Sequence, residues 1–281
     1  MAEVSMKLVK ELRDMTGIGM KACHKALEEA NGDIELAVTN LRKSGMAAAV
    51  KKQDRETNEG IIVFAENEDR VAIVIVNAET DFVVKNEKFI AFANEIAKEV
   101  ADTNPSSLES FLEQKFSKDP KITIEEHRAI IVQTIGENIQ IRHFVVIEKN
   151  PQKSIGIYSH LGGKIVVAVE IEGANTEKPL AKDIAMHITA SDPLFLSREK
   201  VPEDEILKEK EIAKTQMIGK PENVVNKIIE GKLQAFYEKN CLSEQPFIRD
   251  EEKSVSEIVA QRAKEINKDL VVTNFIRLSI K

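Results

Sequence analysis

The feature of this chain that most constrains its fold is an order of sequence patterns that occurs twice. Short apolar runs at residues 61–64 and 71–76 are followed by an amphipathic stretch at 89–100, and the same order returns at 156–158, 165–171 and 180–193. The runs are typical of strands, and the spacing of apolar residues in the longer stretches is typical of helices. A β-β-α unit that occurs twice predicts two α+β subdomains related by internal pseudo-symmetry.

The two predicted helices strengthen the case for a duplication. Their segments, FANEIAKEVADTNP and LAKDIAMHITASDP, share the spacing of apolar residues, and each ends at a proline, Pro105 and Pro193. We expect a further helix near 123–138 and further strands at 144–147 and 270–278. The second strand of the first copy is apolar on both faces, which predicts a strand buried on both sides.

The N-terminal part of the chain carries a different pattern, three short amphipathic stripes at helical spacing. The breaker at 16–19 separates the first two, and Asn31-Gly32 is a natural helix end before Asp33, which can N-cap the third. A charged stretch, KKQDRETNEG at 51–60, follows and is typical of a domain boundary. We therefore predict a three-helix domain over residues 1–54.

The second copy carries an insertion. Residues 203–218 and 223–240 are charged segments with helical spacing, separated by the strong breaker Gly219-Lys220-Pro221. They predict an antiparallel helical hairpin, a short coiled coil, inserted at about 203–240. The predicted fold class is α+β, with the three-helix domain at 1–54, a first core subdomain at 55–149, and a second core subdomain with the hairpin at 150–281.

Composition restricts the compartment and the ligands. The net charge of −7 argues against broad nucleic-acid binding, which depends on neutralising phosphates. No apolar run approaches the roughly 20 residues that a membrane span needs, and the first residues lack the basic and apolar segments of a secretory signal. Cys23 and Cys241 are far apart in sequence, which fits a reducing compartment. We expect a cytoplasmic protein with no nucleic-acid or membrane partner.

No catalytic or metal-binding constellation emerges from the sequence. The five histidines show none of the spacings of a metal site. Cys23 and His24 are neighbours on a predicted helix, so their side chains diverge by about 100°. Phosphate-binding glycine loops are absent as well. We expect no enzyme activity, no metal and no cofactor. An enzyme that uses His160 or His187 stays open as an alternative and would need a concave site of convergent polar groups.

The predicted loop between the buried strand at 71–76 and the next helix carries more apolar residues than a surface loop usually does. Between the buried strand and the next helix the chain reads Asn77-Ala78-Glu79-Thr80-Asp81-Phe82-Val83-Val84-Lys85-Asn86, although such connections lie at the surface. Two interpretations stay open. In the first, the three apolar residues at 82–84 pack beneath the helix. In the second, Phe82 is an exposed anchor beside the charge of Asp81, the type of residue that dominates protein interfaces.

Several motifs together resemble one family, that of elongation factor Ts. The segment VKELRDMTGIGMKACHKALEEANGDIELAVTNLRKSG resembles the family's N-terminal domain, and the Thr80-Asp81-Phe82-Val83 loop with Lys85-Asn86 is similar to a family motif. Further similar segments are Ile135-Gly136-Glu137-Asn138, Gln140-Ile141-Arg142, Asp183-Ile184-Ala185-Met186-His187, Glu230-Gly231-Lys232 and Gln245-Pro246-Phe247. They follow the family's order over most of the chain. The first segment alone would also fit a ubiquitin-associated domain.

The resemblance implies a fold and a partner. The implied fold has an N-terminal ubiquitin-associated-like domain, duplicated α+β core subdomains and a coiled-coil hairpin. The implied partner is elongation factor Tu, bound in its GDP-bound and nucleotide-free forms, with release of GDP so that GTP can enter. In the family an Asp-Phe pair pushes between helices of the partner's GTP-binding domain and disturbs its magnesium site. Here that pair corresponds to Asp81 and Phe82, flanked by Thr80 and Val83.

The resemblance also implies further contacts with the partner. An Ile-Gly pair that meets the same domain corresponds to Ile135 and Gly136, and His160 matches a histidine of the second subdomain. Some relatives carry an additional helical module after the last strand. Because this sequence reaches Lys281 directly after that strand, we do not expect contacts from such a module.

A different function stays open beside this one. A ubiquitin-associated-type adaptor that binds another partner through the N-terminal domain would fit residues 1–54, but it would leave residues 60–281 without a role. Homodimer formation is also left open by the sequence.

Overall fold

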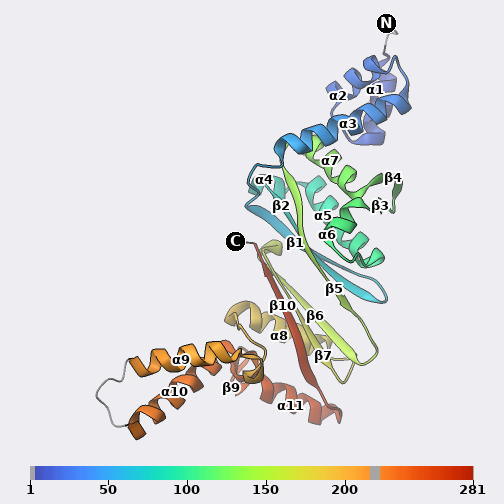
Figure 1. Cartoon of the computed structure of the whole chain (residues 1–281). Helices are drawn as coiled ribbons and strands as arrows, with labels where there is room; N and C mark the ends of the chain where they lie inside the picture. Colours follow the sequence, from blue (N-terminus) through green and yellow to red (C-terminus); the bar gives the residue numbers. More distant parts are fainter. Residues whose placement is uncertain (1–3, 216–221, 281) are drawn as a thin grey trace. The chain divides into compact units, whose positions relative to one another are not determined.

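The computed structural model describes residues 4–215 and 222–280, which form two compact units. The first unit runs to Glu148 and also includes residues 162–164 and the last residues from Ser279. The second unit comprises Lys149–Leu161 and Ile165–Leu278. Figure 1 shows the helices and strands of both units.

Three helices begin the first unit: α1 (Met6–Thr16), α2 (Met20–Glu29) and α3 (Ile34–Lys52). The predicted cap is confirmed, since the Asp33 side chain accepts a hydrogen bond from the Leu36 N–H at 3.0 Å. Gly17 ends α1 at a φ of 67°, a left-handed conformation that favours glycine. The three helices bury a small core of their own, made of Val9, Leu12, Ile18, Cys23, Ala26, Leu27, Ala30, Ala37 and Leu41.

The third helix is longer than the sequence predicts and joins two cores. Its first half packs within the three-helix core, whereas Ala49 near its end is buried with the apolar residues of the first sheet. Gly45 lies close against helix α7 (Ile124–Ile135). A Cβ at Gly45 would come within 3.0 Å of Gln133 Oε1 and 3.5 Å of the Ala129 carbonyl oxygen. A glycine at this position therefore allows the two helices to pack closely.

The link after α3 is shorter and more firmly bonded than predicted. Because α3 continues to Lys52 and the first strand begins at Glu59, the charged stretch is regular at both ends. In between, the buried side chain of Asn138 donates Nδ2 hydrogen bonds to the carbonyls of Gln53 and Arg55, at 3.3 and 2.9 Å. A charged stretch of this kind looks structureless in the sequence, but here a side chain far along the chain binds its backbone. The domain limit predicted there stays a prediction.

The first sheet has three strands in the order β1-β2-β5, namely β1 (Glu59–Glu66), β2 (Arg70–Ala78) and β5 (Ile139–Glu148). The central strand, β2, is antiparallel to both neighbours and mostly buried, as its apolar pattern predicts. Helix α5 (Glu87–Thr103) packs on β1 and β2 (Figure 1). Helix α6 (Leu108–Glu113), the small hairpin of β3 (Lys115–Phe116) and β4 (Asp119–Thr123), and helix α7 complete the unit.

The second unit repeats this order. Strands β6 (Lys153–His160) and β7 (Ile165–Glu172) are antiparallel and precede helix α8 (Lys178–Ser191). The hairpin of β8 (Pro246–Phe247) and β9 (Asp250–Ser254), helix α11 (Val255–Ile266) and strand β10 (Val271–Ser279) follow. The sheet order is β10-β7-β6, which corresponds to β5-β2-β1 of the first unit.

The predicted duplication is confirmed, and it is more extensive than the sequence indicates. Each copy contains a second half, β3-β4-α7-β5 in the first and β8-β9-α11-β10 in the second. The helices that face the sheets, α5 and α8, both end in a left-handed residue, Asn104 at φ 48° and Asp192 at φ 46°, directly before the predicted proline stops. One difference is important for the site. The first copy inserts a short helix, α4 (Asp81–Val84), between its second strand and α5, whereas the second copy passes from β7 to α8 through residues 173–177.

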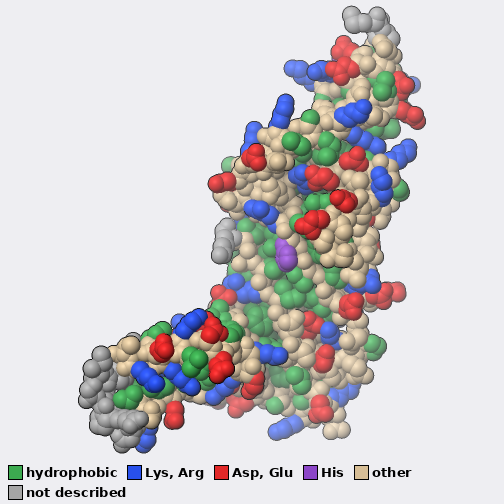
Figure 2. Space-filling view, in the orientation of Figure 1, with side chains coloured by type: hydrophobic (Ala, Val, Ile, Leu, Met, Phe, Trp, Pro, Cys, Tyr) green, Lys and Arg blue, Asp and Glu red, His purple; other side chains and the backbone are tan. Residues whose placement is uncertain are grey.

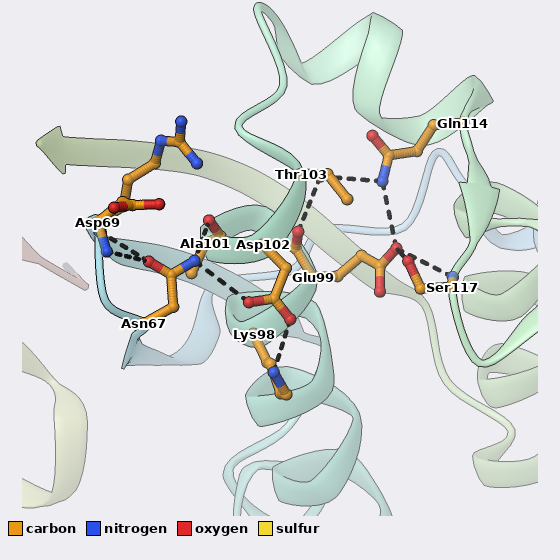
Figure 3. A network of polar contacts seen from close by, with 10 residues as sticks. Asn67, Asp69, Lys98, Glu99, Ala101, Asp102, Thr103, Gln114 and Ser117 are labelled. Atoms are coloured by element: carbon orange, nitrogen blue, oxygen red, sulfur yellow. Dashed lines mark hydrogen bonds and ion pairs between the residues drawn. The ribbon is translucent and has the colours of Figure 1, made fainter.

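Two buried polar side chains occupy the same place in the two copies. In the first unit, Glu99 on α5 is 5% exposed, and its Oε1 accepts hydrogen bonds from the Ser117 N–H at 3.0 Å and Oγ at 2.6 Å, and from Gln114 Nε2 at 3.4 Å (Figure 3). These hydrogen bonds connect the β3–β4 hairpin to helix α5. Burial of a carboxylate is tolerated here because several donors satisfy it.

In the second unit the equivalent residue is His187 on α8. Its Nδ1 accepts from the Ile248 N–H at 3.3 Å, so Nε2 carries the proton and donates to Gln245 Oε1 at 2.9 Å. The Gln245 amide in turn donates to the Lys239 carbonyl at 2.7 Å. Burial lowers the pKa of His187, which keeps the ring neutral in this arrangement.

The predicted helical hairpin is confirmed as α9 (Glu203–Thr215) and α10 (Glu222–Asn240), which pack against each other (Figure 1). Ala213 and Ile229 are buried, at 1% and 7% exposure. Acidic and basic side chains lie among hydrophobic ones on the face of the hairpin seen in Figure 2. Within α9, Lys208 Nζ lies 2.8 Å from Glu205 Oε1. The predicted breaker at 219–221 and the end of the first predicted hairpin helix, residues 216–218, lie outside the described residues.

Candidate interaction site

The short helix α4 resolves the two interpretations of the apolar run at 82–84. Phe82 is 80% exposed, whereas Val83 and Val84 are buried, at 8% and 9%, in the core beneath the sheet. Thr80 caps the helix, with its side-chain oxygen accepting from the Val83 N–H at 3.4 Å. The two valines therefore hold the turn against the core. The ring of Phe82, which precedes them, is left exposed to solvent.

Asp81 adds a negative charge beside the ring. Its Oδ2 accepts a hydrogen bond from Lys85 Nζ at 2.8 Å. That bond lowers the pKa of the Asp81 carboxyl and raises the pKa of the Lys85 ammonium, so both groups are charged at neutral pH. Because both side chains are exposed, the pair contributes little to stability. The Asp81 carboxylate can exchange Lys85 for a group of a binding partner.

A second segment is bonded to this turn. Helix α7 ends at Ile135, which is half-buried against the core, and Gly136 follows at a φ of 94°, exposed and left-handed. The next residue, Glu137, accepts two hydrogen bonds from Thr80, from its N–H at 3.1 Å and from its hydroxyl at 2.8 Å. Lys52 Nζ donates to the Gly136 carbonyl at 2.5 Å. The structure thus brings the predicted residues at 80–83 and at 135–136 together.

A reciprocal bond closes the arrangement. Glu79 Oε1 accepts from the Asn138 N–H at 2.6 Å and from Arg55 Nη1 at 3.4 Å. Two carboxylates, Glu79 and Glu137, therefore cross between the two segments, each accepting from the backbone on the other side. We call Glu79, Thr80, Glu137 and Asn138 the carboxylate clasp.

The sequence interpretation did not find the clasp. It placed Glu79 and Glu137 next to the predicted contact residues but gave neither a role, because Thr80 and Glu137 are 57 positions apart. The one available signal was the presence of an acidic residue beside each of the two motifs.

His160, the remaining predicted contact, lies in the second unit. It is the last residue of β6, half-buried, and its Nδ1 is 3.1 Å from the Tyr158 hydroxyl. The clasp belongs to the first unit, so His160 is not one of its members.

The enzyme alternative gains no support from His187, one of the two histidines that it would use. Both ring nitrogens of buried His187 are engaged in hydrogen bonds, which leaves neither free for proton transfer. Among residues 4–215 and 222–280, no three His, Cys, Asp or Glu side chains are grouped so as to hold a metal ion.

No helix in the described part of the chain has the length and apolar character needed to cross a membrane.

An exposed aromatic anchor beside a carboxylate, on a turn held by buried valines and hydrogen bonds, is an arrangement typical of protein-binding sites. Comparison with known proteins identifies the class. The family model described as "Elongation factor TS" matches residues 79–281, and the model described as "UBA-like domain" matches residues 6–42.

Relatives match over the full length. The chain is 60% identical over 280 residues to an elongation factor Ts of Protochlamydia amoebophila, which covers 100% of this chain and 99% of the relative. It is 42% identical to that of Chlamydia muridarum and 43% identical to that of Chlamydia trachomatis serovar L2, in each case over 98% of both chains. The chain belongs to the elongation factor Ts family, a family of translation elongation factors that serve protein biosynthesis. The resemblance inferred from the motifs is confirmed.

Proposed function

We propose that this protein binds elongation factor Tu, in its GDP-bound and nucleotide-free forms, and promotes release of GDP so that GTP can enter. The single observation that carries this proposal is the exposure of Phe82, at 80%, directly after the ionised Asp81 and directly before two buried valines. Family membership supports the choice of elongation factor Tu as the partner.

The proposed mechanism is a coupling between two binding events. The protein must bind the nucleotide-free partner better than the GDP form, and by linkage GDP weakens the protein's hold by the same factor. Burial of Phe82 in the partner supplies ~2–4 kcal/mol, the range of an aromatic hot-spot residue. This free energy is available to the exchange reaction because Phe82 is not buried within its own chain.

The magnesium ion of the partner is the proposed target. Mg²⁺ demands near-ideal octahedral geometry, so a small displacement of its ligands strongly weakens the binding of the ion to the partner. We propose that Asp81 and Phe82 enter between helices of the partner's GTP-binding domain, with Thr80 and Val83 holding the turn. Ile135 and Gly136 contact the same domain from the adjoining segment, and His160 contributes a contact from the second unit.

This activity requires no chemistry from the protein itself. No bond is made or broken, so we propose an exchange factor and not an enzyme, without metal or cofactor, acting in the cytoplasm and without nucleic-acid or membrane partners. The adaptor alternative accounts for the UBA-like match at 6–42, but the family match covers 79–281. Homodimer formation is not needed for the proposed mechanism.

Reciprocity gives a direct test of the proposal. The affinity of the protein for elongation factor Tu is measured by titration at a series of GDP concentrations. We expect affinity to fall as GDP rises, and added magnesium to strengthen that effect. An affinity that is independent of GDP would contradict the proposal, and capture of a different protein in preference to elongation factor Tu would favour the adaptor.

A further inference from the structure

We propose that Glu137 is a positioning residue, which holds the α4 turn in the conformation that presents Phe82 before any partner is bound. This inference rests on the proposed function. It concerns a residue that lies outside the predicted contact set and that reaches Phe82 only through Thr80.

Helix α4 is too short to set its own conformation. It has four residues, Asp81–Val84, and so cannot be stable as an isolated helix. Its conformation must come from tertiary contacts. Val83 and Val84 fix its buried side, but side-chain packing alone does not set the direction from which the backbone enters the helix. That direction depends on Thr80.

The bonds of Thr80 to Glu137 supply this missing constraint. The Thr80 N–H and hydroxyl donate to the two different carboxylate oxygens of Glu137, at 3.1 Å to Oε2 and 2.8 Å to Oε1. The hydroxyl oxygen also accepts from the Val83 N–H at 3.4 Å. A hydroxyl has one proton to donate, so the bond to Glu137 orients it and leaves its lone pairs for the N–H of α4. One carboxylate therefore fixes both the backbone and the cap of the turn.

Glu137 is itself held on a firm base. It lies between Gly136, which caps α7, and Asn138, which is fully buried. The Asn138 N–H is bonded to Glu79 at 2.6 Å, and its side chain binds the link after α3. The carboxylate clasp thus connects α7, β5, the link and the turn. A site supported in this way meets the requirement that contact residues be locked by their neighbours.

The functional consequence is preorganisation. If the presenting conformation were populated only part of the time, the apparent affinity for the partner would fall by that fraction. Glu137 removes this loss, because the turn does not have to be ordered when Phe82 is inserted.

The test uses the full chain and two substitutions that alter the clasp differently. Glu137→Gln keeps the shape and removes the charge, whereas Glu137→Asp keeps the charge and shortens the reach to Thr80. The control is Glu113→Gln, at an exposed glutamate on α6. Amide hydrogen exchange of residues 80–85, melting temperature, and the rate of fluorescent-GDP release from elongation factor Tu are measured, each also in a Phe82→Ala background.

We expect both Glu137 variants to exchange the amides of residues 80–85 faster than wild type, with other amides unchanged. Release of GDP should slow by about fivefold, which corresponds to the loss of one net hydrogen bond. Neither variant should slow release further in the Phe82→Ala background, because Glu137 acts through Phe82. Glu113→Gln should match wild type.

Unchanged amide exchange at 80–85 in both variants would overturn the inference, as would equal slowing of release with and without Phe82. A general loss of protection and of melting temperature would show a structural role instead. If the wild-type protein does not accelerate GDP release from elongation factor Tu, the proposed function is wrong. The hydrogen-exchange result still decides whether Glu137 holds the turn.

Discussion

Replacement of Phe82 by alanine should affect the stability of the fold and the binding of a partner to different extents. Both effects can be estimated from the exposed area of the side chain. A phenylalanine side chain presents roughly 200 Å² of surface. Since Phe82 is 80% exposed, folding removes only about 40 Å² of it from water, worth about 1 kcal/mol at about 25 cal/mol per Å². The remainder, roughly 160 Å², would supply up to ~4 kcal/mol on burial in a partner, consistent with a hot-spot residue.

The expected result for Phe82→Ala is therefore a nearly unchanged melting curve and a large defect in exchange. We expect GDP release to slow at least tenfold, equivalent to about 1.4 kcal/mol. The matched control is Phe89→Ala, at the start of α5, where the side chain is 0% exposed and its loss should cost ~3–5 kcal/mol of stability. Asp81→Ala should also slow release, by less, since the contribution of an interfacial charge depends on its desolvation.

Circular-dichroism melts and stopped-flow release of fluorescent GDP provide the two measurements. A Phe82→Ala protein that melts as early as Phe89→Ala, yet exchanges normally when folded, would refute the reasoning. Such a result would mean that the ring is part of the core and that the exposed position is not its functional one.

Three further results follow from the structure. Deletion of the hairpin by joining Pro202 to Lys239 through a short Gly-Ser linker should leave a soluble protein that unfolds cooperatively, because α9 and α10 pack on each other; aggregation would show that they cover the core. Asn138→Ala should cost about 1–3 kcal/mol, the penalty for buried groups left without partners, and should speed tryptic cleavage in the link after Lys52; unchanged cleavage would contradict the bonding described for the link. Burial lowers the pKa of His187 below 6.5, so the unfolded chain binds a proton first and the free energy of unfolding should fall as the pH drops below about 6.5. Urea midpoints at about pH 7.5 and 5.5 should differ less in His187→Gln than in wild type, and an equal difference would contradict the assignment.

Much of the fold could be predicted because its signals are local. The cap at Asp33, the doubly apolar strand at 71–76 and the paired stops before Pro105 and Pro193 each depend on residues close in sequence. The elements that the sequence did not reveal are held by distant partners. Strands β3 and β8 have two residues each, too few to show a period, and they are fixed by the buried side chains of Glu99 and His187.

The geometry of the candidate site could not be predicted from the sequence. Phe82, Val83 and Val84 are all apolar, so hydrophobicity cannot tell which of them faces water. The fold decides, because successive residues of a helix turn by about 100° and the two valines are needed by the core. The clasp was beyond sequence reasoning for a different reason, since its bonds join residues that meet only after β2 and α7 have been placed.

The most direct test of the proposed exchange activity is the release of fluorescent GDP from elongation factor Tu, followed with and without this protein at a large excess of unlabelled nucleotide. We predict that catalytic amounts of the protein accelerate release, and that the acceleration is reduced at least tenfold by Phe82→Ala, or about 1.4 kcal/mol. A release rate that is the same with and without the wild-type protein would contradict the account.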